Sequence, residues 1–125
     1  MFSQVEMVKA RRAIEKFYSG TCTITEYQKF QKPNKSMGFR EEVVLENQPC
    51  RLSFSTANQT NQTETGASSV SQIIKLFLAP EIQVKSGSKL TITQNGVTAD
   101  YVRSGEPSHY STHQEIILEL FKGWA

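Results

Sequence analysis

The sequence is poor in the residues on which most catalytic and metal sites depend. Its 125 residues include two cysteines, two histidines and a single aspartate. Cys22 and Cys50 do not have the spacing of a metal motif and are too few for a disulfide framework, so we interpret them as small core residues of a reduced cytosolic protein. The sequence also has no G-x-S-x-G elbow, no G-x-G-x-x-G loop and no Walker lysine. We therefore expect a protein that is not an enzyme and that binds no cofactor or metal.

Long apolar runs and an excess of one charge are absent too. No run approaches the roughly 18 apolar residues that a membrane-spanning helix needs. Fourteen basic and twelve acidic residues leave a net charge of +2, which is small for a dedicated nucleic-acid-binding protein. Glu6 interrupts the first residues and no cleavage site follows, so they do not resemble a signal peptide. We expect neither membrane association nor secretion.

The sequence shows the pattern of one helix followed by short strands. Its length fits a single domain, residues 1–125. An S-x-x-E capping box opens a run of apolar residues with a period near 3.6, which predicts a helix over about 2–18. After Gly20 the period changes to two, and strands are predicted over about 21–54 and 71–121.

Turn signals divide these strands. Residues 32–35 and 48–49 are predicted to end strands, and residues 82–84 are predicted to form a short strand of their own. Asn95 and Gly96 tolerate the positive φ angles of a type I′ turn and form the strongest hairpin signal. This pattern indicates a mainly β fold, a small antiparallel β-barrel or sandwich with an N-terminal α-helix and a long polar loop.

Residues 55–69 interrupt the strand pattern. They contain no large apolar side chain and one charged residue, Glu64. Such a segment cannot bury enough apolar area to offset its ordering entropy, so we predict a mobile loop over 55–70. Loops of this length are often functional, although a tolerated surface insertion explains the composition equally well.

The remaining candidates for chemistry are explained more readily by structure. His109 and His113 lie four residues apart without a helical period, so we expect loop or structural histidines rather than metal ligands. Trp124 is costly to leave in water, and we expect it to dock on a neighbour or on its own barrel. Four aromatic residues alternate within strands and are expected in the core rather than on a base-stacking platform: Tyr27, Phe30, Phe54 and Phe77.

Several short motifs follow one another in the C-terminal half. They are Leu76-Phe77-Leu78-Ala79-Pro80-Glu81, Gly87-Ser88-Lys89-Leu90-Thr91, Thr93-Gln94-Asn95-Gly96, Ser104-Gly105 with Pro107 and Tyr110-Ser111, His113-Gln114-Glu115, and Glu119-Leu120-Phe121 with Trp124. In this order and spacing they resemble the head–tail connector proteins of Gram-positive siphophages and of PBSX-type defective prophages, the XkdH-like group. A looser resemblance over residues 47–53 and the helix extends it to most of the chain.

The resemblance implies a structural, non-enzymatic phage or prophage protein that completes the head, a minor capsid protein. Such proteins form a homo-oligomeric ring, a dodecamer where it follows the portal. The ring closes the DNA channel after packaging and docks the tail. The implied partners are the portal or an adaptor protein, tail proteins and, transiently, the packaged DNA, with no membrane. The implied locations are the host bacterial cytoplasm during assembly and then the head–tail interface of the phage particle. No catalytic motif is carried over.

The loop and the resemblance together give the candidate site residues. We expect the 55–70 loop to project into the channel and help to retain DNA, through Asn58, Gln59, Asn61, Gln62, Glu64 and Gly66. Phe121 and Trp124 are expected to dock a neighbouring subunit or the tail. The alternative function is an OB-like nucleic-acid-binding module, which would need a basic, aromatic-lined face. A small hydrolase is a third class, which the residue inventory does not support.

Overall fold

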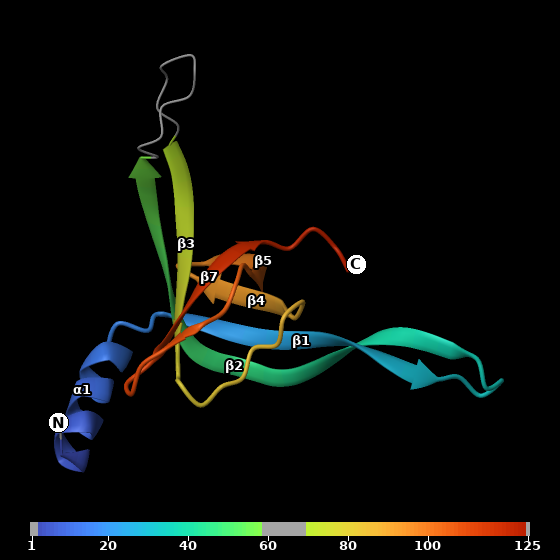
Figure 1. Ribbon diagram of the computed structural model, residues 1–125, viewed down its shortest axis with the longest axis horizontal. Helices are drawn as coiled ribbons and strands as arrows, with labels where there is room; N and C mark the ends of the chain where they lie inside the picture. The colour runs from blue at the N-terminus through green and yellow to red at the C-terminus, as the bar shows by residue number, and fades with distance from the viewer. Residues whose placement is uncertain (1–2, 59–69, 125) are drawn as a thin grey trace.

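The computed structural model of the chain describes residues 3–58 and 70–124. Within them, one helix precedes a series of strands, so the mainly β fold expected from the sequence is confirmed (Figure 1). The elements are α1 (Gln4–Glu15), β1 (Gly20–Gln31), β2 (Met37–Asn58), β3 (Val70–Leu78), β4 (Lys89–Gln94), β5 (Val97–Arg103), β6 (Ser108–His109) and β7 (Gln114–Leu120). Ser3 caps the helix by accepting a hydrogen bond from the Glu6 N–H at 3.2 Å, as the capping box predicts.

The strands form one antiparallel sheet that closes on itself. Neighbouring strands follow the order β3-β2-β1-β4-β5-β7-β6, and β3 pairs with β7 as well. This additional pairing runs from Ile74 opposite Leu118 to Leu78 opposite Gln114. It joins the two ends of a six-stranded sheet into a ring. A closed ring satisfies the backbone groups that an open sheet would leave at its edges.

The interior of this ring is the hydrophobic core of the chain. Alternate strand positions point inward because successive side chains of a strand lie on opposite faces. Each large apolar side chain that is fully buried there stabilises the fold by about 1.5–3 kcal/mol relative to an exposed one. The most deeply buried residues are Cys22, Ile24, Cys50, Leu76, Leu78, Leu90, Ile92 and Ile116.

Two of the predicted turns are confirmed and one is wrong. The hairpin between β1 and β2 turns through residues 32–36, and Asn95 and Gly96 have the positive φ angles, 54° and 76°, of a type I′ turn. The break predicted at residues 48–49 does not occur, because β2 continues through a bulge at Asn47, where φ is 52°. Pro49 pairs with Thr21 on a stretch where β1 is the only strand beside β2 among the described residues, a position that tolerates a missing N–H.

The short strand predicted at residues 82–84 is also wrong. Side chains, not a neighbouring strand, hold this segment. Gln114 Nε2 donates to the carbonyl oxygens of Ala79 and Ile82 at 2.8 and 2.5 Å, and Arg103 Nη1 donates to that of Val84 at 3.0 Å. These side-chain hydrogen bonds satisfy the backbone carbonyl groups near the core, in place of the backbone hydrogen bonds that a neighbouring strand would make.

The loop predicted over 55–70 is wrong for residues 55–58 and 70, which lie in strands. Residues 55–58 belong to β2 and pair with residues 70–73 of β3, because the backbone ladder continues beyond the ring even where the side chains are polar. Asn58 therefore lies in a strand, opposite Val70. The other candidate loop residues, Gln59, Asn61, Gln62, Glu64 and Gly66, lie outside the described residues.

Three elements project from the ring (Figure 1). The first is the continuation of β1 and β2 over residues 26–42, which we call the arm. The second is the paired end of β2 and β3, residues 55–58 and 70–73, which we call the extension. The third is α1, in which no residue is buried. In the part of the chain that the structure describes, no helix is long and apolar enough to cross a membrane.

Candidate functional site

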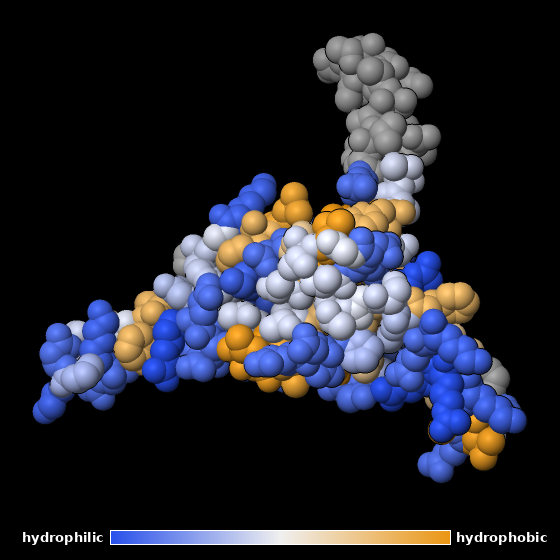
Figure 2. Space-filling view, turned by 180° about the vertical axis from the view of Figure 1, so that it is seen from behind, coloured by the Kyte–Doolittle hydropathy of each residue, from blue (hydrophilic) through white to orange (hydrophobic). Residues whose placement is uncertain are grey.

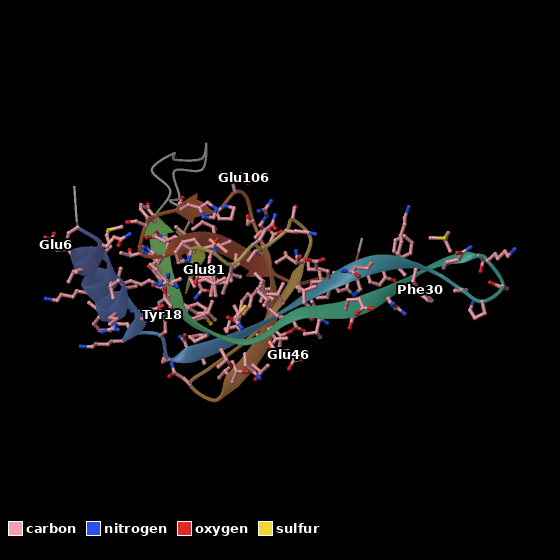
Figure 3. All side chains as sticks on the ribbon, turned by 90° about the horizontal axis from the view of Figure 1, so that it is seen from below. Glu6, Tyr18, Phe30, Glu46, Glu81 and Glu106 are labelled. Atoms are coloured by element: carbon pink, nitrogen blue, oxygen red, sulfur yellow. The ribbon has the colours of Figure 1, made fainter. Side chains whose placement is uncertain are left out.

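The arm is the most distinctive surface of the molecule, because no third strand pairs with it among the described residues. β1 pairs with β4 only as far as Thr25 opposite Lys89. Beyond that point β1 and β2 pair with each other alone among the described residues, up to Gln31 opposite Met37. Figure 3 shows this ribbon standing away from the ring, with Phe30 far along it. An isolated two-stranded hairpin is marginally stable at best in water, so a ribbon of this kind is suited to being covered by another surface.

One face of the arm carries exposed apolar side chains beside polar ones. Lys29 lies opposite Phe39, and Gln31 lies opposite Met37, so these four side chains share a face. The Tyr27 and Phe39 rings on this face are stacked with their centroids 5.3 Å apart. Phe39 is nevertheless 52% exposed and Met37 is 59% exposed. We call Tyr27, Met37 and Phe39 the open face.

The other face of the arm is satisfied within the chain. Phe30 lies opposite Gly38, and the Arg40 guanidinium lies 4.9 Å from the centre of the Phe30 ring. A Cβ at Gly38 would come within 3.1 Å of that ring, so the glycine leaves room for the aromatic side chain. Arg40 also pairs with Glu42 at 2.7 Å. The two faces of one ribbon therefore differ, since one is covered by its own side chains and one is open.

Trp124 packs on the base of the open face. Its ring stacks on Tyr27 at 4.8 Å and meets Phe121 edge-on at 5.0 Å. Its Nε1 donates to Glu41 Oε1 at 2.8 Å, and Lys89 Nζ lies 3.2 Å from the same oxygen. The hydrogen bond from Trp124, and then the one from Lys89, lower the pKa of Glu41. Of the two alternatives that the sequence left open for Trp124, the structure shows docking on its own chain. The role of Phe121 and Trp124 toward a neighbour stays a prediction.

A second apolar surface lies at the end of the ring next to the extension, and we call it the mouth. Phe54 and Val97 form its rim and are 52% and 66% exposed. The rim surrounds a hollow of about 190 Å³, and Gln94 closes one side by bonding the N–H and carbonyl of Leu52 at 2.8 and 3.1 Å. The hollow is lined by Leu52, Phe54, Ile92, Gln94, Asn95, Val97 and Tyr101.

The core positions expected for the four strand aromatics are wrong, because Tyr27, Phe30, Phe54 and Phe77 all lie outside the buried core. Phe54 and Tyr27 are exposed rather than buried. Phe54 stays exposed because β2 has passed the end of β1 at Gly20 and pairs only with β3 there. Tyr27 stays exposed because it belongs to the arm, which has no interior. Figure 2 shows hydrophobic patches on the arm and on the ring near the base of the extension.

A groove separates α1 from the outside of the ring. The Arg51 guanidinium lies 5.8 Å from the centre of the Phe17 ring and 5.9 Å from that of Phe77, and so bridges helix and sheet. Burial raises the pKa of Tyr18, at the edge of this groove, to about 12. Arg11 ties the helix to the ring by a 2.7 Å ion pair with Glu81. These contacts hold α1 beside the ring without burying it.

His113, one of the two histidines considered from the sequence, contacts several side chains. His113 Nε2 lies 2.8 Å from Glu115 Oε2, and the His113 ring stacks on Tyr110 at 4.9 Å. The hydrogen bond to His113 and the one to Lys75 lower the pKa of Glu115. Across the described ranges, no group of three histidine, cysteine, aspartate or glutamate side chains is placed to hold a metal ion. His109 lies in β6.

The two cysteines occupy the core, as expected. Cys22 and Cys50 are free thiols with no exposed surface. Burial raises the pKa of each thiol to about 12. Thiols held in this way are structural rather than nucleophilic.

Comparison with known proteins gives one structural likeness. No family model and no curated protein matches the chain. Among solved structures, the phage-like element PBSX protein xkdH of Bacillus subtilis is similar over 80% of this chain and 91% of that one, with a TM-score of 0.47 and 8% sequence identity. That protein bears the name of the group that the sequence resembles. At this TM-score and identity the likeness carries no conclusion about the role of the chain.

Proposed function

We propose that this chain is a structural subunit of a phage or prophage particle, which acts through contacts with other protein chains rather than through chemistry. The observation that supports it best is the arm, a two-stranded ribbon with exposed apolar side chains on one face, whose described contacts with the rest of the chain lie at its base. Such a ribbon gains stability when another surface covers it. The assignment to a phage particle comes from the sequence motifs alone.

The other projections fit the same role. Helix α1 buries no residue of its own, although Val5 and Val8 are apolar. The extension is a second two-stranded ribbon. A small closed core with three elements reaching outward is the shape expected of a subunit that is completed by its neighbours, because each projection exposes side chains that another chain can cover.

More specifically, we propose that the chain is a head–tail connector. In this role the chain forms a ring between portal and tail, closes the DNA channel after packaging and docks the tail. The segment expected to act in the channel begins and ends at Asn58 and Val70, where pairing between β2 and β3 holds both of its ends on the extension. A loop carried on a paired base can change position without opening the core.

The test is reconstitution. Purified chain is added to portal-bearing, DNA-filled heads that lack it, and the vertex is imaged by electron microscopy. We expect density below the portal, and we expect heads completed with a variant in which residues 59–69 are replaced by a short Gly-Ser link to bind the chain but leak DNA. Trimming a loop changes its closure entropy by only about 0.6 kcal/mol per halving, so this variant keeps its fold.

Three outcomes would count against the proposal. Absence of the chain from the vertex would contradict the connector role. Full DNA retention by the trimmed variant would contradict the role of the loop. Tight binding to oligonucleotides that weakens steeply with salt would favour the OB-like alternative, because phosphate contacts are lost as counterions compete.

A further inference from the structure

The side-chain amide of Gln114 is satisfied on one side only. Gln114 is the first residue of β7 and is fully buried. Its Nε2 donates to the carbonyl oxygens of Ala79 and Ile82. Its Oε1 is buried as well and accepts no hydrogen bond from the described residues. Leaving a buried acceptor without a donor is costly, so this oxygen needs a donor that the described residues do not supply.

A polar hollow of about 390 Å³ lies beside this amide, and we call it the amide hollow. Gln114 lines it together with the 82–86 segment, Arg103 at the end of β5 and His109 of β6. His109 lies directly opposite Gln114 in the β6–β7 pair, so the two side chains share one face of that ribbon. The fold therefore gathers polar groups from three strands and one connecting segment around the unpaired acceptor.

The charged side chains of the amide hollow favour an anion. Its lining holds two cations, Lys85 and Arg103, and one acid, Glu106. Arg103 is only 15% exposed, and its bond to the Val84 carbonyl uses one of five N–H groups. The acidic partners of both cations are weak. Lys85 Nζ lies 3.8 Å from Glu26 Oε1, and Arg103 Nη2 lies 3.5 Å from Glu106 Oε1, both longer than a good hydrogen bond. An anion in the hollow can therefore compete for these donors.

We propose that the amide hollow binds a small oxyanion that carries its own hydrogen, of which hydrogen phosphate is the simplest. The oxygens of the ion accept from Arg103 and, at the rim, from Lys85 and His109. Its hydroxyl donates to Gln114 Oε1. An anion without a hydrogen, such as sulfate or a phosphodiester, would set an oxygen against the unpaired acceptor, so the site discriminates against both. The inference goes beyond the proposed function and does not depend on it, because a phosphodiester backbone such as that of DNA lacks the required hydrogen.

The test is a titration of the full chain at constant ionic strength, followed by NMR and by calorimetry. Inorganic phosphate is the probe, and sulfate is the control ion of the same shape. We expect phosphate to shift the side-chain amide signals of Gln114 and the backbone signals of residues 82–86. We also expect phosphate to bind at least about tenfold more tightly than sulfate, because sulfate leaves the buried acceptor unpaired.

Variants separate the rim of the hollow from its buried amide. Lys85→Ala and His109→Ala should each weaken phosphate binding by about twofold to fivefold, the usual effect of an exposed charge or donor. Lys9→Ala, on the exposed surface of α1, is the matched control and should change nothing. Gln114→Met should bring the ratio of phosphate to sulfate affinity close to one, a change of selectivity that loosening of the hollow alone would not produce. Circular dichroism checks each fold, and the wild-type selectivity and the rim variants decide the matter if Gln114→Met unfolds.

Four results would overturn the inference. They are unchanged Gln114 signals at millimolar phosphate, equal wild-type affinity for phosphate and sulfate, rim variants that bind phosphate as wild type does, and a folded Gln114→Met chain that still prefers phosphate. A single-stranded oligonucleotide that shifts the same signals as strongly would assign the hollow to nucleic-acid backbone and reject the inference as well. None of these results affects the proposed function, which is tested separately at the head vertex.

Discussion

A single strand, β1, passes through two very different environments. Over residues 20–25 it lies between β2 and β4, and Cys22 and Ile24 are fully buried. Over residues 26–31 it has β2 alone beside it, and Tyr27 is exposed. The ladder of backbone hydrogen bonds is continuous through both parts. The ring and the arm therefore share the same strand geometry. They differ because the inward side chains of the ring pack on side chains from other strands, whereas those of the arm do not.

This contrast separates residues that stabilise the fold from residues that are exposed to contact another chain. In the ring, the free energy of unfolding depends on apolar burial, and each inward side chain contributes to it. In the arm, the same kind of side chain contributes little to the fold and is available to another chain. Substitutions in the ring should therefore change the free energy of unfolding strongly. Substitutions in the arm should change it little.

The largest expected difference concerns thiol reactivity. Burial raises the pKa of Cys22 and Cys50 to about 12, and only the thiolate attacks a disulfide reagent. At mildly alkaline pH we expect both native thiols to react at least about a thousandfold more slowly than a free thiol. Val43→Cys on the exposed part of β2 is the control and should react at once. Rapid reaction of the wild-type thiols would show that the ring opens in the native state.

Core truncation should have the next largest effect. Leu76→Ala removes a fully buried side chain from β3 and should lower the free energy of unfolding by about 2–5 kcal/mol in chemical denaturation. Phe39→Ala removes a larger side chain from the arm, and the loss should be limited to the value of its stack on Tyr27, about 0.5–1.5 kcal/mol. Equal losses from the two substitutions would mean that the arm folds as part of the core.

Removal of a buried amide should have an intermediate effect. Gln114→Met keeps the size of a fully buried side chain but leaves the carbonyls of Ala79 and Ile82 without their donor. We expect a loss of about 1–3 kcal/mol in the free energy of unfolding. Gln28→Met removes an amide that bonds Glu26 on the exposed arm, and its effect should stay within about 0.5 kcal/mol. A neutral Gln114→Met would show that the 79–82 segment does not depend on this amide.

The aromatic contact at the base of the arm should matter locally. Trp124→Ala removes the stack on Tyr27, worth about 0.5–1.5 kcal/mol for an aromatic pair. We expect amide exchange to speed up by up to about tenfold along the arm and to stay unchanged in the ring. The lowered pKa of Glu41 means that its bonds stabilise the native state above the usual pKa of a glutamate and are lost as pH falls through the lowered value. Acidification should therefore speed up amide exchange along the arm, as Trp124→Ala does. If neither change alters the exchange rates of the arm, Trp124 does not pack there in solution.

The smallest effect should come from the surface ion pair that ties α1 to the ring. Arg11→Ala removes the contact with Glu81, whose side chain is largely exposed. Exposed pairs contribute about 0–1 kcal/mol, so global stability should barely change. Methyl or amide signals of α1 should shift while those of the ring stay in place. A loss comparable to that of Leu76→Ala would show that the helix is part of the cooperative core.

The sequence predicted the ring better than the projections, for physical reasons. Alternating apolar residues record burial on one face, so Cys22 and Leu52 could be assigned correctly. Asn95 and Gly96 marked a turn because few residues accept positive φ. The strand break predicted at Pro49 was wrong because a proline is tolerated where a strand pairs with a single neighbouring strand. The sequence does not show how many strands pair with a given strand.

The candidate surfaces were harder to predict. Trp124 was singled out because a large aromatic residue is costly to expose, and Phe121 because it belongs to a motif of the resemblance; the structure does bring them together. Phe39 and Val97 were missed because the alternation of Met37 with Phe39, and of Val97 with Ala99, predicts a strand but does not show that these side chains stay uncovered. Their exposure follows from where they lie on the arm and the ring, which depends on pairing between distant strands.

The closing of the ring by β7 has a consequence for the order of folding. β7 pairs with both β3 and β5, and it follows every other strand in the chain. Until Leu118 is available, two strand edges remain unpaired, and contacts as distant as Ile74 with Leu118 cannot form. During synthesis the nascent chain must hold an incomplete sheet in solution, where open edges invite mispairing with other nascent chains. We therefore expect ring closure to be a late step of folding, and chains that lack β7 to be prone to aggregation.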